Sequence, residues 1–154
     1  MTHSGMTPIV KSVARLVTGF AAVFGIYVAV TGHLGPGGGF AGGVVLAAAA
    51  ILAVLAFGRT ESQKLLTESR CHVWDAAAAA AFLLVAFLGF FEGSFFVNFI
   101  QAIYRGQLHS LVSAGTIPVS NLAICVKVAA GLAGVFVALS AFRRARMERE
   151  SLDG

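Results

Sequence analysis

Residues 31–43 read Thr-Gly-His-Leu-Gly-Pro-Gly-Gly-Gly-Phe-Ala-Gly-Gly, and this glycine-rich stretch decides the fold. It joins two long apolar runs with almost no polar spacer, so the turn is expected at a membrane surface or slightly within it. Backbone groups that faced lipid there would lack hydrogen-bond partners, at a cost of several kcal/mol each. We therefore expect the turn to pack closely against other protein, as in a subunit of a larger assembly.

The composition is that of an integral membrane protein. Of the 154 residues, 58% are hydrophobic and 12% are charged, and the mean hydropathy is +0.86. A soluble domain of this size needs far more charge on its surface. The net charge of +4 does not indicate nucleic-acid binding, because the basic residues gather at the ends of apolar segments and form no stripe interleaved with aromatics. We expect no nucleic-acid partner.

The predicted fold class is an all-α bundle of four transmembrane helices, with an interfacial segment before the last. Crossing about 30 Å of hydrocarbon takes about 20 apolar residues. Four segments meet this requirement, at about 10–31, 39–57, 75–91 and 119–142, followed by a cytoplasmic tail at 143–154. Between residues 92 and 118 the apolar side chains follow a near-helical spacing, so this segment is expected along the membrane surface or against a partner. Asp75 is expected to cap the third helix at its N-terminus.

The basic residues also predict the orientation. Lysines and arginines flank the membrane segments on one side, and Arg105 alone falls on the other. By the positive-inside rule, both termini and the loop between the second and third helices face the cytoplasm. The sequence therefore predicts a multi-pass protein of the cell (inner) membrane.

Two motifs resemble a known family. The turn matches the pattern Gly-His-Asn-x-Pro-Gly-Gly-Gly-Phe-x-Gly-Gly, with Leu34 in place of the usual Asn; the matching residues are Gly32, His33, Pro36, Gly37, Gly38, Gly39, Phe40, Gly42 and Gly43. A second match runs from Gly115 to Ala123 and on to Lys127. Over essentially its whole length, the chain resembles a single MnhB-like domain, the MnhB component of the multisubunit Na+/H+ antiporters of the Mrp or Mnh type.

The resemblance implies a membrane subunit of a monovalent cation/proton antiporter, with Na+ and H+ as transported ions and with other subunits and the lipid bilayer as partners. It would contribute to assembly and to the ion path. Two alternatives remain open: an Mrp-like subunit of an energy-converting complex such as a membrane-bound hydrogenase, and a purely structural scaffold. The sequence has no nucleophile–base pair, metal-ligand cluster or cofactor motif, so we expect a transporter subunit that is not an enzyme by itself and carries no metal or cofactor.

Lys127 is the strongest candidate for a functional residue. It lies eight residues inside the expected fourth helix, which is about 12 Å along the helix axis. Ionisable groups at such a depth are expensive, face protein or water, and mark ion or proton paths. The alternative is that Lys127 pairs with a carboxylate of a neighbouring subunit and only holds the complex together.

Other polar and small residues have weaker assignments. Glu92, at the outer end of the third helix, is a candidate for attracting cations, or else a solvated helix end. His33 is a candidate proton relay, or else it satisfies a backbone carbonyl. The residues assigned to the turn and to subunit packing are Pro36, Gly37, Gly38, Gly39, Phe40, Gly42, Gly43 and Asn121, the last as a hydrogen-bonding group between helices.

Overall fold

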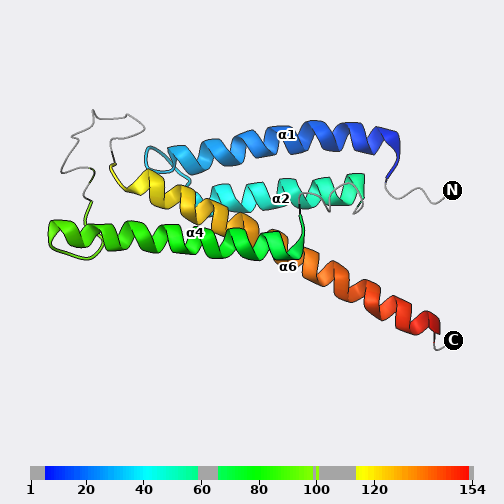
Figure 1. Cartoon of the computed structure of the whole chain (residues 1–154). Helices are drawn as coiled ribbons and strands as arrows, with labels where there is room; N and C mark the ends of the chain where they lie inside the picture. The colour runs from blue at the N-terminus through cyan, green and yellow to red at the C-terminus, as the bar shows by residue number, and fades with distance from the viewer. Residues whose placement is uncertain (1–5, 59–65, 99, 101–113, 153–154) are drawn as a thin grey trace.

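The computed structural model of the chain describes residues 6–58, 66–98, 100 and 114–152, and in these ranges it is helical, without strands. Its elements are α1 (Pro8–Thr31), α2 (Gly39–Phe57), α4 (Glu68–Leu88), the 3-10 turn η1 (Gly89–Glu92) and α6 (Ile117–Leu152) (Figure 1). Four of these helical stretches are long and apolar enough to cross a membrane. The predicted all-α fold with four membrane-crossing helices is therefore confirmed. Most of the expected interfacial segment, at 99 and 101–113, lies outside the described residues.

Two helix boundaries differ from the sequence-based prediction. The third helix begins at Glu68 and not at residue 75, so Asp75 is a mid-helix residue and not the N-cap, a position that Thr67 occupies. A glutamate in the first turn favours this earlier start, because it complements the helix dipole. The fourth helix continues through the charged tail to Leu152. Arg146 and Glu150, whose Nε and Oε1 atoms lie 3.2 Å apart, form an i,i+4 pair of the kind that supports an exposed helix.

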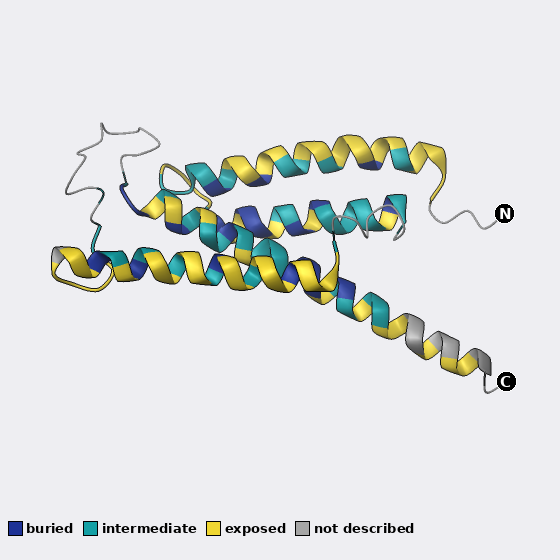
Figure 2. Ribbon diagram, viewed as in Figure 1, coloured by how far each residue is buried: buried dark blue, intermediate teal, exposed yellow. Residues whose placement is uncertain are grey.

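Helix α6 lies at the centre of the bundle. It packs against both α2 and α4, whereas α1 packs mainly on α2 (Figure 1). Small side chains form most of the buried core among the described residues: Ala14, Ala29, Ala47, Ala49, Ala56, Cys71, Ala78, Ala86, Cys125 and Ala133. Many large apolar residues are exposed, and Figure 2 shows exposed positions, in yellow, along the helices. This arrangement is typical of membrane helices, which approach closely through small residues and leave large ones for lipid or partner subunits.

The glycines of the turn make close approaches within this chain. A Cβ atom on Gly42 would lie 2.6 Å from the Gly25 carbonyl oxygen on α1, and one on Gly43 would lie 2.6 Å from the Cys125 carbonyl oxygen on α6. A Cβ on Gly39 would collide with the Asn121 carbonyl of α6. At these three positions the glycines therefore pack against other helices of the same chain.

The chain folds back on itself after η1. The backbone N–H of Phe96 donates to the Ala86 carbonyl at 3.1 Å, and the rings of Phe82 and Phe96 have centroids 5.4 Å apart. The Asn98 side chain then accepts a hydrogen bond from the Thr116 N–H at 2.9 Å. These contacts tie the end of α4 to the start of α6, and so help to fix the position of the two helices that carry the site.

Candidate functional site

The site is an ion pair between the third and fourth membrane-crossing helices. Lys127 Nζ on α6 donates to Asp75 Oδ1 on α4 at 2.9 Å. Lys127 lies ten residues after Ile117, about 15 Å along α6, and Asp75 lies seven residues after Glu68, about 10 Å along α4. Lys127 therefore lies inside the apolar span of α6, at a depth where charges are rare, whereas Asp75 ends the polar first turns of α4 and directly precedes its apolar run, which begins at Ala76.

Local packing explains why the two side chains meet. Helices α4 and α6 run antiparallel in contact (Figure 1), and Asp75 faces Gly131, one turn beyond Lys127 on α6. A Cβ atom on Gly131 would lie 3.7 Å from Asp75 Oδ1, so the glycine leaves open space beside the carboxylate. The flexible lysine stem spans the remaining turn and places its ammonium group on the carboxylate.

The pair balances its own charge but is only partly covered. The side chains of Lys127 and Asp75 are 48% and 37% exposed in this chain. A charged group facing hydrocarbon costs several kcal/mol. The uncovered parts of both side chains are therefore expected to meet water or the polar surface of another subunit.

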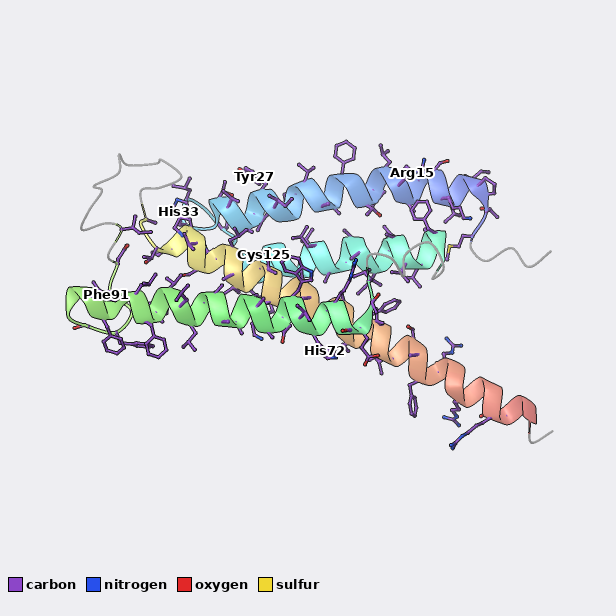
Figure 3. The ribbon with its side chains drawn as sticks, in the orientation of Figure 1. Arg15, Tyr27, His33, His72, Phe91 and Cys125 are labelled. Carbon is purple, nitrogen blue, oxygen red and sulfur yellow. The ribbon has the colours of Figure 1, made fainter. Side chains whose placement is uncertain are left out.

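The three candidates from the sequence do not come together. Lys127 pairs with Asp75, while His33 lies half-buried in the turn between α1 and α2. Glu92 ends η1, seventeen residues after Asp75, which is about 25 Å farther along the helix. Figure 3 shows His33 and Phe91 at the same end of the bundle. His33 and the backbone of Glu92 thus lie near one end of the bundle, remote from the ion pair.

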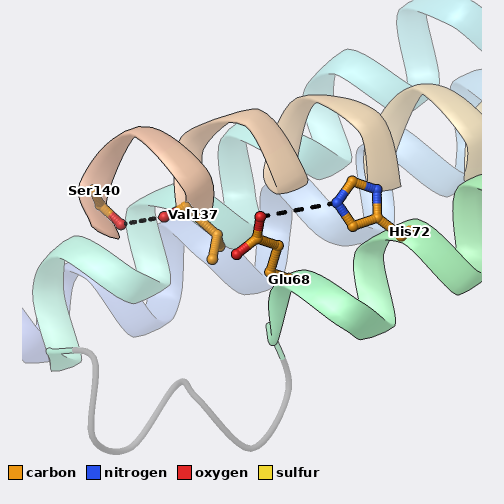
Figure 4. A network of polar contacts seen from close by, with 4 residues as sticks. All are labelled: Glu68, His72, Val137 and Ser140. Carbon is orange, nitrogen blue, oxygen red and sulfur yellow. Dashed lines mark hydrogen bonds and ion pairs between the residues drawn. The ribbon is translucent and has the colours of Figure 1, made fainter. Parts of the chain in front are cut away.

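Polar residues that precede Asp75 were not among the candidates from the sequence. Glu68, Cys71 and His72 lie on the same side of α4 as Asp75, because positions i, i+3, i+4 and i+7 share one helix face. Figure 4 shows the first contact along this face, where Glu68 Oε1 lies 4.0 Å from His72 Nε2. The spacing is present in the sequence, but a helix that begins at residue 75 leaves these residues in a loop.

The described residues offer no cluster of three or more His, Cys, Asp or Glu side chains that could hold a metal ion. Cys71 and Cys125 are free thiols, both buried. The chemistry that this arrangement supports is the movement or pairing of charge, carried by carboxylate, imidazole and ammonium groups.

The fold and the site define a multi-pass membrane protein with an ion pair between two of its membrane-crossing helices. Residues 9–134 match the model of a family described as a domain related to the MnhB subunit of Na+/H+ antiporter. The chain belongs to this MnhB family, as its two motifs predicted.

Known relatives come from bacteria and archaea. The chain is 29% identical to a Staphylococcus aureus protein named "Putative antiporter subunit mnhB2", over 88% of this chain and 95% of that protein. It is 35% identical to the uncharacterised protein MJ1307 of Methanocaldococcus jannaschii, over 87% of this chain but only 52% of that protein. A chain in the structure of the membrane-bound sulfane sulfur reductase, an archaeal respiratory membrane complex, superimposes with a TM-score of 0.73 at 27% identity, over 90% of this chain and 60% of that one.

Proposed function

We propose that this protein is the MnhB-type membrane subunit of a multisubunit Na+/H+ antiporter and that the Lys127–Asp75 pair lies on the ion path of the complex. The observation that carries the proposal is the pair itself, in a chain of the MnhB family. Charged groups within membrane-crossing helices are costly and usually mark ion or proton paths, which supports this role for the pair. An ammonium group that contacts a carboxylate on one side and water or a partner on the other is suited to passing a charge onward.

The pair also explains how the subunit tolerates its own lysine. With Asp75 at 2.9 Å, the lysine needs no carboxylate from a neighbouring subunit to be neutralised. Because Asp75 supplies the countercharge within the same chain, a neighbouring subunit can place a different group, or water, against the exposed side of Lys127. We expect the large subunits of the complex to cover this side and to supply the main transport machinery.

We further propose that both termini and the loop joining α2 to α4 face the cytoplasm. The distribution of lysine and arginine supports this orientation. Fusion of a reporter that fluoresces only in the cytoplasm to the C-terminus tests it: a fluorescent fusion is expected, and a dark fusion made in full amount contradicts it.

The experiment that tests the function is measurement of cation/proton exchange with and without the subunit. Everted vesicles are prepared from cells that lack the gene and from the same cells carrying it on a plasmid. Addition of Na+ is expected to collapse a preformed proton gradient only when the subunit is present, as reported by a pH-sensitive dye. Equal responses in the two preparations, with the complex verified by mass spectrometry, would contradict the proposal.

A second candidate function has one observation in its favour. The similarity to a chain of the sulfane sulfur reductase complex supports a role in an Mrp-like membrane module of a redox-driven complex. Purification of the tagged protein from its native membranes separates the two. Iron–sulfur or hydrogenase-type subunits in the isolated complex, and Na+ movement that requires an electron donor, would favour the redox-driven complex.

A further inference from the structure

A groove runs along the contact between α4 and α6, with a volume of about 290 Å³. One wall carries the polar face of α4 and the other is made of small residues of α6. The lining residues are Glu68, Cys71, His72, Asp75, Ala130, Gly131, Gly134, Val135 and Ala138. A space of this size beside several polar groups meets both requirements for holding water, which are room and hydrogen-bond partners.

The ionisable groups in the groove form a series from the start of α4 to the ion pair. Glu68 Oε1 lies 4.0 Å from His72 Nε2, His72 is one helical turn from Asp75, and Asp75 contacts Lys127 at 2.9 Å. The series covers about 10 Å along α4, from the start of the helix to the start of its apolar run. Glu68 and His72 are exposed, with 54% and 74% of their side chains accessible, so the series is open at the end where α4 begins.

Such a series has an obvious chemical use. Carboxylates and imidazoles that follow one another inside a membrane are the usual relays of protons, and histidine changes its protonation state close to neutral pH. The small residues on α6 keep the groove open beside the polar face of α4.

We infer that this groove is a water-filled half-channel that carries protons between the cytoplasmic end of α4 and the Lys127–Asp75 pair, through Glu68 and His72. The inference rests on the proposed function, to which it adds the route and the transported species. In this proposal Asp75 holds the proton beside Lys127, and Glu68 and His72 exchange it with water at the cytoplasmic end of α4.

Access of water to Gly131 tests the groove directly. Replacement Gly131→Cys is made in a Cys71→Ala, Cys125→Ala background, where the new Cβ finds Asp75 Oδ1 at 3.7 Å and needs no rearrangement. The neighbouring Leu132, which is 43% exposed and lies on a different face of α6, provides the control Leu132→Cys. Everted vesicles containing the whole complex are treated with a charged, membrane-impermeant thiol reagent. We expect Gly131→Cys to react and Leu132→Cys to remain unmodified.

The same modification tests transport, because it fills the groove after the complex has folded and assembled. Labelling of Gly131→Cys with the bulky charged reagent is expected to lower the rate of Na+-driven proton movement at least tenfold. Glu68→Gln and His72→Gln are each expected to lower it several-fold, with normal amounts of assembled complex.

The outcomes separate the inference from the function on which it rests. Protection of Gly131→Cys from the reagent would mean that lipid or a partner helix fills the groove, and would overturn the half-channel. Full transport after labelling would overturn it as well. Absence of cation/proton exchange in every form of the complex, the unmodified one included, would overturn the proposed function and the inference together.

Discussion

A double-mutant cycle on Asp75 and Lys127 gives the most informative prediction about stability. At 2.9 Å and an effective dielectric constant of about 20, the attraction between two unit charges is about 6 kcal/mol before the cost of removing water. Both side chains remain more than a third exposed, so desolvation and screening offset most of this value. We expect a coupling free energy of about 2 kcal/mol between the two side chains, within the range for groups in direct contact.

The perturbations are Asp75→Asn, Lys127→Met and the two combined. Each single change leaves one charge without its partner, while the double change removes both charges. The double variant should therefore be more stable than the sum of the single effects predicts, and it should approach the original protein.

Cys125 provides the assay. Its side chain is 1% exposed, so its thiol reacts only when α6 separates from its neighbours. In a Cys71→Ala background, the rate of Cys125 labelling in the native complex reports the free energy of opening. A coupling of about 2 kcal/mol corresponds to about a 30-fold deviation from additive rates. If the two single changes in the free energy of opening add up to that of the double variant within about 0.5 kcal/mol, the ion pair does not stabilise the structure.

Three further changes, the first with a matched control, have expected effects on stability. Gly43→Val should destabilise the bundle by about 2 kcal/mol or more, because even a Cβ at this position would lie 2.6 Å from the Cys125 carbonyl oxygen. The Cys125 labelling rate measures this loss. The control Gly35→Ala should leave stability unchanged, because a Cβ there would have nothing within 4 Å. Asn98→Ala removes the acceptor of the Thr116 N–H and should cost about 1–2 kcal/mol, seen as faster hydrogen exchange at the start of α6. Arg146→Ala should change stability by less than about 0.5 kcal/mol, because its pair with Glu150 is exposed; a larger loss would contradict that assignment.

Most of the fold was predictable from local pattern. Apolar runs of about 20 residues leave the chain no alternative to helices in a bilayer, and the glycine-rich turn marks the first hairpin. The start of α4 was not predictable in this way, because residues 68–72 are too polar to be counted as part of an apolar run. Their helical conformation depends on the helix that follows them and on the contact with α6.

The site was half predictable. Lys127 stands out because a lysine inside an apolar run is rare, and this needs no knowledge of its surroundings. Asp75 was misread as a cap, because its pairing depends on the register between α4 and α6, which are 52 residues apart at the pair. Register is set by close contacts such as that of Gly134 with Cys71, where a Cβ would lie 3.2 Å away. No single-helix pattern contains that information.

The packing partner of the glycine motif was only partly predictable. A turn packed against protein was expected, but the sequence alone did not distinguish a partner subunit from another part of the chain. Gly39 and Gly43 contact α6, more than 80 residues later in the sequence, and Gly42 contacts α1. The exposed large side chains of α1, with Phe20 at 72%, leave its outer face for lipid or for a neighbouring subunit.

The role of the Lys127–Asp75 pair in transport is tested by Na+-driven proton movement in everted vesicles containing Lys127→Ala, Lys127→Arg or Asp75→Asn. The amount of assembled complex is determined for each variant on a native gel. We predict that Lys127→Ala and Asp75→Asn lose at least nine-tenths of the rate, and that Lys127→Arg, which keeps the charge but cannot release a proton, fares little better. Normal rates in assembled complexes of all three variants would contradict a role for this pair in the ion path.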